Sequence, residues 1–110
     1  MTDIVTDEAV ERALDYLGKN AGAAAKARAE RIYVEEFRKS LKARLMKEHV
    51  GESIGAQERE AYADPRYLEH LEAIKQAVFC DEHQRFLRQA AIAKVEAWRS
   101  ASANRRVSVL

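Results

Sequence analysis

Apolar side chains recur at steps of three or four residues along most of the chain, a spacing that places them on one face of an α-helix. Two long stretches, about residues 21–48 and about residues 65–101, carry this pattern. The first has no proline or glycine after Gly22, and the second has none after Pro65. They are predicted to form two long helices. Their seam, in the core or between copies of the chain, consists of Val34, Phe37, Leu41, Leu45, Leu71, Ile74, Val78 and Phe86.

Residues with capping ability mark where the helices should begin and end. The Thr6 side chain can accept a hydrogen bond from the first turn of a short helix, and Gly18 can end that helix in the left-handed conformation. Asp64 followed by Pro65 predicts the start of the last helix, because Asp is a favoured cap and Pro fits the first helical position.

Gly51 and Gly55 predict a chain reversal between the two long helices, with a short helix or a distorted turn after it. No strand pattern is present, so the predicted fold is all-α: an antiparallel, coiled-coil-like hairpin of two long helices with a short N-terminal helix. The last helix has a second apolar face that includes Phe79, Phe86 and Ala93. Because two faces imply two neighbours, a homo-oligomer is expected.

Length and composition limit the organisation of the chain. Its 110 residues predict one helical domain over residues 1–110, with 102–110 as a flexible basic tail. The single cysteine excludes an intramolecular disulfide, and no apolar run reaches the roughly 18 residues that could cross a bilayer, so no membrane partner is expected. The first residues lack the basic and apolar regions of a secretory signal, which predicts a cytoplasmic protein.

Charge is distributed unevenly along the sequence. Residues 83–110 contain six basic residues and one acidic residue, whereas residues 51–82 contain three basic and eight acidic residues. Basic side chains beside an aromatic ring can bind phosphates and stack bases, or they can anchor a protein interface. The candidate residues for binding nucleic acid or a partner are Trp98, Arg99, Arg105, Arg106, Arg88 and Lys94. A solvated helix surface paired with nearby acids is the simpler interpretation.

No catalytic or cofactor-binding motif is present, so we expect neither an enzyme nor a cofactor. Cys80 and His83 stand three residues apart on the predicted last helix. Two ligands are too few for a structural zinc site, and a thiol near a surface imidazole explains the pair without a metal. No metal site is therefore predicted.

Fifteen positions carry a resemblance to a known group of proteins. They are the segment 14–17 with Lys26 and Ala27, then Arg59, Glu60, Tyr62 and Ala63, and then Val95, Trp98, Arg99, Asn104 and Arg105. On these residues the chain resembles small non-structural helical phage proteins of unknown function, which are found among phage DNA recombination and replication genes. The resemblance implies an accessory role in phage DNA metabolism, in the cytoplasm of an infected bacterial host.

Two functions are consistent with these observations. The first is a non-enzymatic phage accessory protein that binds a recombination or replication protein, single-stranded DNA, or both. The second is a protein-only inhibitor or adaptor, such as a phage counter-defence factor, that docks on a host protein. Salt sensitivity distinguishes them, because binding to DNA weakens steeply with salt whereas an apolar interface need not.

Overall fold

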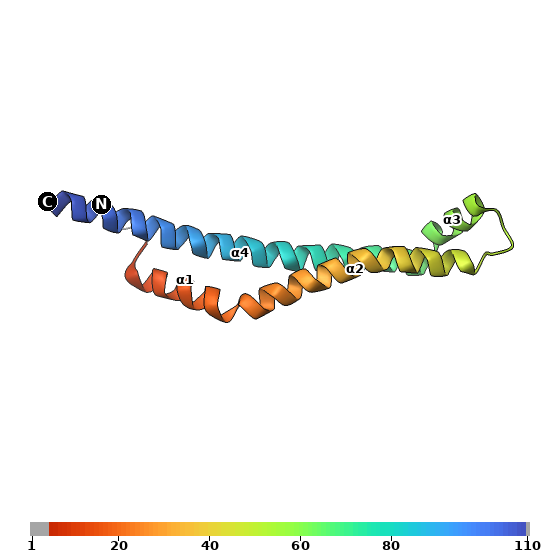
Figure 1. Ribbon diagram of the computed structural model, residues 1–110, viewed down its shortest axis with the longest axis horizontal. Helices are drawn as coiled ribbons and strands as arrows, with labels where there is room; N and C mark the ends of the chain where they lie inside the picture. The colour runs from red at the N-terminus through yellow and green to blue at the C-terminus, as the bar shows by residue number, and fades with distance from the viewer. Residues whose placement is uncertain (1–4, 110) are drawn as a thin grey trace. The chain divides into compact units, whose positions relative to one another are not determined.

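The computed structural model describes residues 5–109, with side chains up to Val107. Four helices follow one another: α1 (Asp7–Lys19), α2 (Ala21–Lys47), α3 (Ile54–Ala63) and α4 (Pro65–Val109) (Figure 1). Residues 5–109 contain no strand, so the all-α prediction is confirmed, as are the two long helices that pack against each other.

The chain divides into two compact units. Residues up to Ala25 and from His83 onward form unit 1, and Lys26–Glu82 form unit 2. The single-domain expectation stays a prediction.

The first helix begins where the sequence predicts. Thr6 lies in extended backbone, and its Oγ1 accepts a hydrogen bond from the Ala9 amide at 3.1 Å. The predicted end at Gly18 is wrong. No described glycine has a positive φ, and the helix continues to Lys19. Asn20 ends it instead, because its backbone N–H and its side-chain amide both donate to the Tyr16 carbonyl, which satisfies an otherwise free helix end.

The reversal between the long helices contains Gly51, as expected, but Gly55 lies inside α3. The first turn of α3 is capped by Ser53, whose Oγ accepts from the Ala56 amide at 3.2 Å. Asp64 caps α4 as predicted, because its Oδ1 accepts from the Arg66 amide at 2.8 Å. The predicted start of α4 is therefore confirmed, whereas the Ser53 cap of α3 was not predicted.

The end of α4 lies beyond its predicted position near Ala101. The helix includes residues 102–109, most of the segment expected to be a tail, while Leu110 lies outside the described residues. Extending an existing helix by one residue costs much less than starting one, and residues 101–106 include alanines and arginines that favour helix. The weak helix propensity of the last residues was therefore not enough to end α4 near Ala101.

In unit 2 the first half of α4 runs alongside α2 in the opposite direction, with α3 at one end (Figure 1). The core there is a cluster of Leu45 (3% exposed), Ala61 and Tyr67, and Leu41 and Met46 pack against it. The Tyr62 and Tyr67 rings meet edge to face at 5.3 Å. The prediction that Leu45 is a core residue is thereby confirmed.

The inner face of α4 lies beside the predicted seam rather than along it. Within unit 2 its buried and half-buried positions include Tyr67, His70, Ile74, Ala77 and Asp81, which follow steps of three and four residues, and Val78 and Glu82 beside them are half-buried as well. This step is that of the a and d positions of coiled coils. Of the predicted seam, Val34, Phe37, Leu41, Ile74 and Val78 are half-buried, while Leu71 and Phe86 are exposed. The prediction selected large apolar residues for the seam, whereas the residues that α4 buries in unit 2 are the small Ala77 and the amphipathic Tyr67.

Arg31 of α2 occupies an inner position that an apolar side chain would ordinarily fill. Its guanidinium contacts Glu35 on its own helix at 3.0 Å, and Asp81 and Glu82 of α4 at 3.2 and 3.1 Å. Hydrogen bonds from these carboxylates, Glu35 first, raise the pKa of Arg31 further above its already high ordinary value. The His70 Nε2 adds a second polar link at 2.7 Å from the Val34 carbonyl oxygen.

A second ion-pair group joins the end of α2 to the start of α4. The Arg66 guanidinium contacts both oxygens of Glu48, and it also donates to the two oxygens of Asp64 at 3.0 and 2.9 Å. These hydrogen bonds hold the pKa of Glu48 and the pKa of Asp64 below their ordinary values. Two sets of contacts therefore stabilise the reversal: the ion pairs of Arg66 and the apolar cluster around Leu45.

Leu45→Ala should lower the free energy of unfolding by about 2–5 kcal/mol, because it removes a buried side chain and leaves a cavity. Val50→Ala is the control, since Val50 is 78% exposed and its change should stay within about 0.5 kcal/mol. Urea denaturation followed by circular dichroism measures both values. Equal values for the two variants would contradict the assigned core.

The Arg66 group predicts a stability that depends on pH. The pKa values of Glu48 and Asp64 are lowered in the folded state from ordinary values of 4.5 and 3.8. Their contribution is therefore present above those values and is lost as pH falls below them. Arg66→Gln should flatten the fall in stability below about pH 4.5, whereas Arg59→Gln, at an exposed position, should not. Denaturation curves across this pH range test the difference.

Candidate functional site

Four of the six predicted binding residues come together near the end of α4. Trp98, Arg99, Arg105 and Arg106 line a shallow hollow of about 470 Å³ together with Ser102. We call these five residues the α4 basic end. They share one side of the helix because their spacing follows its three- to four-residue turn.

The three arginines of the α4 basic end differ in their contacts. Arg99 contacts Glu96 at 3.6 Å in an exposed pair, which contributes little in water. Arg105 donates to the Ser102 hydroxyl at 3.2 Å, and Arg106 makes no hydrogen bond or ion pair with any described residue. Glu96 is the last acidic residue of the sequence. Three arginines and no acidic side chain therefore follow Glu96 in the sequence.

Trp98 has a structural contact as well as a place in the hollow. Its indole Nε1 donates to Asp7 Oδ1 at 2.6 Å, and its ring is half-buried. Asp7 is the first residue of α1. The contact therefore fastens the start of α1 to α4 within unit 1, and it occupies the one hydrogen-bond donor of the indole.

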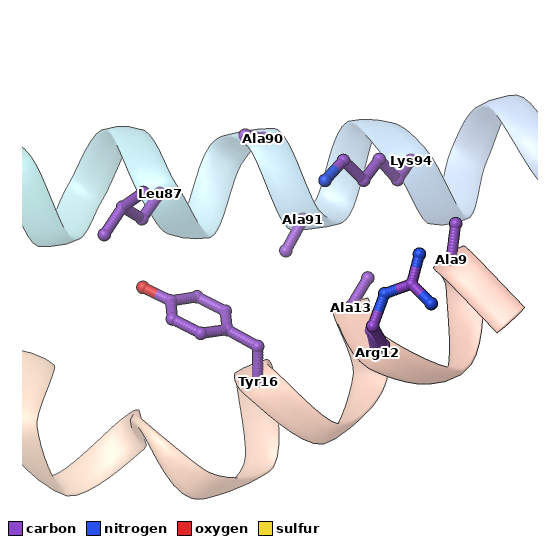
Figure 2. A pocket seen from close by; sticks show the side chains of 8 residues that line it. All are labelled: Ala9, Arg12, Ala13, Tyr16, Leu87, Ala90, Ala91 and Lys94. Carbon is purple, nitrogen blue, oxygen red and sulfur yellow. The ribbon is translucent and has the colours of Figure 1, made fainter. Parts of the chain in front are cut away.

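Lys94 lies instead in a groove between α1 and α4, which Figure 2 shows from close by. We call it the α1–α4 groove. Its volume is about 280 Å³, and its lining consists of Ala9, Arg12, Ala13, Tyr16, Leu87, Ala90, Ala91 and Lys94. Ala13 and Ala91 are buried at 6% and 5% exposure. Because alanine side chains are short, the two helices meet closely there while space stays open beside them.

The two ends of the α1–α4 groove differ in chemistry. In Figure 2 the Tyr16 ring lies opposite Leu87 at one end, while Arg12 and Lys94 lie at the other. The Tyr16 hydroxyl donates to Gln84 Oε1 at 3.4 Å, which orients the ring. Arg12 and Lys94 form no hydrogen bond or ion pair with the described part of the chain. The groove therefore joins an apolar end to a cationic one.

Sequence reasoning missed Arg12 and Tyr16. The available signal was their spacing with Ala9 and Ala13, which places all four on one face of a helix. Because the first twenty residues carry a net negative charge, Arg12 was not considered as a binding residue. The remaining candidate, Arg88, is exposed and lines neither the groove nor the α4 basic end.

The structure also places the residues considered for a metal. Cys80 and His83 are exposed on α4. Within residues 5–109 no group of three or more His, Cys, Asp or Glu side chains is arranged to hold a metal ion. Over the same residues no helix combines the length and the apolar character needed to span a bilayer.

Comparison of the chain with protein-family models, with curated proteins and with solved structures finds no match.

Trp98→Phe should loosen α1, because it keeps an aromatic ring but removes the hydrogen bond to Asp7. A loss of about 1 kcal/mol is expected, which corresponds to roughly fivefold faster amide hydrogen exchange in α1. Exchange around Leu45, in unit 2, is the internal control and should not change. Unaltered protection of α1 would show that the Asp7 contact does not hold the helix in place.

Proposed function

We propose that the protein is a non-enzymatic accessory protein of phage DNA recombination or replication. It binds single-stranded DNA through the α4 basic end, alone or together with a recombination protein, in the cytoplasm of an infected bacterium. The phage setting is supported by the resemblance at Val95, Trp98 and Arg99 described above. We also propose that α2 and α4 form a coiled-coil-like hairpin, a view supported by the three- and four-residue steps of their inner positions.

The observation that carries the proposal is a surface with three arginines and no acidic residue after Glu96. Guanidinium groups bind phosphates and displace the counterions of nucleic acid. Single-stranded DNA suits this surface because its bases are open to contact with the exposed part of the Trp98 ring. Double-stranded DNA hides the faces of its bases, so Trp98 would add nothing to its binding.

A second candidate function is favoured by apolar side chains on α4 that stay exposed. Phe79, Phe86 and Ile92 are 66%, 59% and 45% exposed, and exposed apolar surface often marks a protein interface. These residues support a protein-only inhibitor or adaptor that docks on a host protein. The same side chains support the homo-oligomer expected from the sequence.

Salt dependence tests the first function. The triple variant Arg99→Gln, Arg105→Gln, Arg106→Gln should bind a labelled thymidine oligonucleotide more weakly than the wild type. Its salt dependence should also flatten, by about 0.7 in log–log slope for each phosphate that the variant no longer neutralises. Fluorescence anisotropy between about 50 and 200 mM salt measures both effects.

The matched control removes the same charge from unit 2. Arg28, Arg38 and Lys47 are exposed on α2 and form no hydrogen bond or ion pair with described residues. Their triple substitution to Gln should leave affinity near that of the wild type. If both triple variants lose affinity equally, binding depends on net charge alone. If the wild type does not bind the oligonucleotide, the protein-docking function becomes the better proposal.

A further inference from the structure

The α1–α4 groove has the chemistry of a site for an anion with a flat apolar body. Its apolar end is made by the Tyr16 ring and Leu87, and its floor by buried alanines (Figure 2). Its other end holds two cations that no described acidic residue neutralises. Two like charges beside one groove repel each other, and a bound anion relieves that repulsion.

A nucleotide combines these two properties in one molecule. A base presents a flat π-face that stacks on aromatic side chains, and its phosphate binds Arg and Lys. The groove volume of about 280 Å³ lies close to the lower limit of small-molecule sites. The space therefore suits a single nucleotide rather than a larger ligand.

Lys94 connects the α1–α4 groove to the α4 basic end. Lys94 and Trp98 stand four residues apart on α4, so they lie on one face of the helix, about one turn from each other. A strand whose phosphate contacts Lys94 can therefore continue along that face to Arg105. A free mononucleotide is too short to contact both surfaces, so their continuity favours a DNA strand as the ligand.

We propose that the α1–α4 groove holds one nucleotide of a single DNA strand, with its base against Tyr16 and Leu87 and its phosphate at Arg12 and Lys94. This inference rests on the proposed function and assigns to it a second subsite, built jointly by α1 and α4. It gives α1 a role in binding DNA beyond its role in packing.

The test compares Arg12→Gln, Lys94→Gln with Lys26→Gln, Arg28→Gln, a pair of exposed α2 residues with the same charges. Binding of a labelled thymidine oligonucleotide should weaken roughly 10- to 30-fold near 0.1 M salt in the groove variant, with a slope flatter by about 1.4. The α2 variant should bind like the wild type. Circular dichroism confirms that each variant folds.

Crosslinking locates the base independently of affinity. An oligonucleotide that carries 4-thiothymidine should crosslink under light to the peptide that contains Tyr16, and free thymidine monophosphate should compete only at much higher concentration than unlabelled oligonucleotide. Equal competition by the monophosphate would overturn a DNA strand as the occupant and assign the groove to a free nucleotide.

The remaining outcomes separate the inference from the function on which it rests. If the groove variant binds as the α2 variant does while the Arg99, Arg105 and Arg106 variant is weakened, the groove is not a subsite and DNA binding stands. If the wild type binds neither the oligonucleotide nor the monophosphate, both proposals fail.

Discussion

The structure depends on close packing between α4 and the helices beside it in each unit. Seven apolar residues are buried in the described part of the chain, and four of them are alanines: Ala13, Ala61, Ala77 and Ala91. Alanine buries little apolar area but lets helix backbones approach closely, so much of the attraction comes from dispersion between well-packed atoms. A face of this kind favours long helices, because each residue adds only a small contribution.

Small residues pack well but specify position poorly, since one alanine layer resembles the next. The polar contacts between helices fix how each helix is aligned along its neighbour. In unit 2, Arg31 joins Asp81 and Glu82, and His70 joins the Val34 carbonyl. In unit 1, Tyr16 joins Gln84, and Trp98 joins Asp7. Each contact is satisfied only at one alignment of the helices, which is the best-attested use of polar groups in such packing.

Some basic residues are neutralised by carboxylates within the fold, and others are not. In unit 2, Arg31, Lys42 and Arg66 are each held by carboxylates of another helix or of a helix cap. In unit 1, Arg12 and Lys94 have no such partner among the residues that the structure describes. Cations neutralised within the fold stabilise it, whereas unneutralised ones remain available to anions from outside. Arg12 and Lys94 also line the α1–α4 groove, which supports the proposed role of unit 1 in binding.

The sequence by itself determined the helical class, the start of α1 at Thr6 and the start of α4 at Asp64, because periodicity and caps act over a few neighbouring residues. It also identified Leu45 as core and grouped Trp98 with Arg99, Arg105 and Arg106. It did not find the end of α4, which depends on helix propagation over many residues.

Only the tertiary structure decided which side chains α4 buries and which residues of α1 meet Lys94. The choice between Leu71 and His70 as an inner position depends on a partner helix that the local pattern does not reveal. The α1–α4 groove depends likewise on residues 9–16 lying against 87–94. Contacts between residues so distant in the chain leave no periodic signal, because they are set by the register of two helices rather than by the spacing within either.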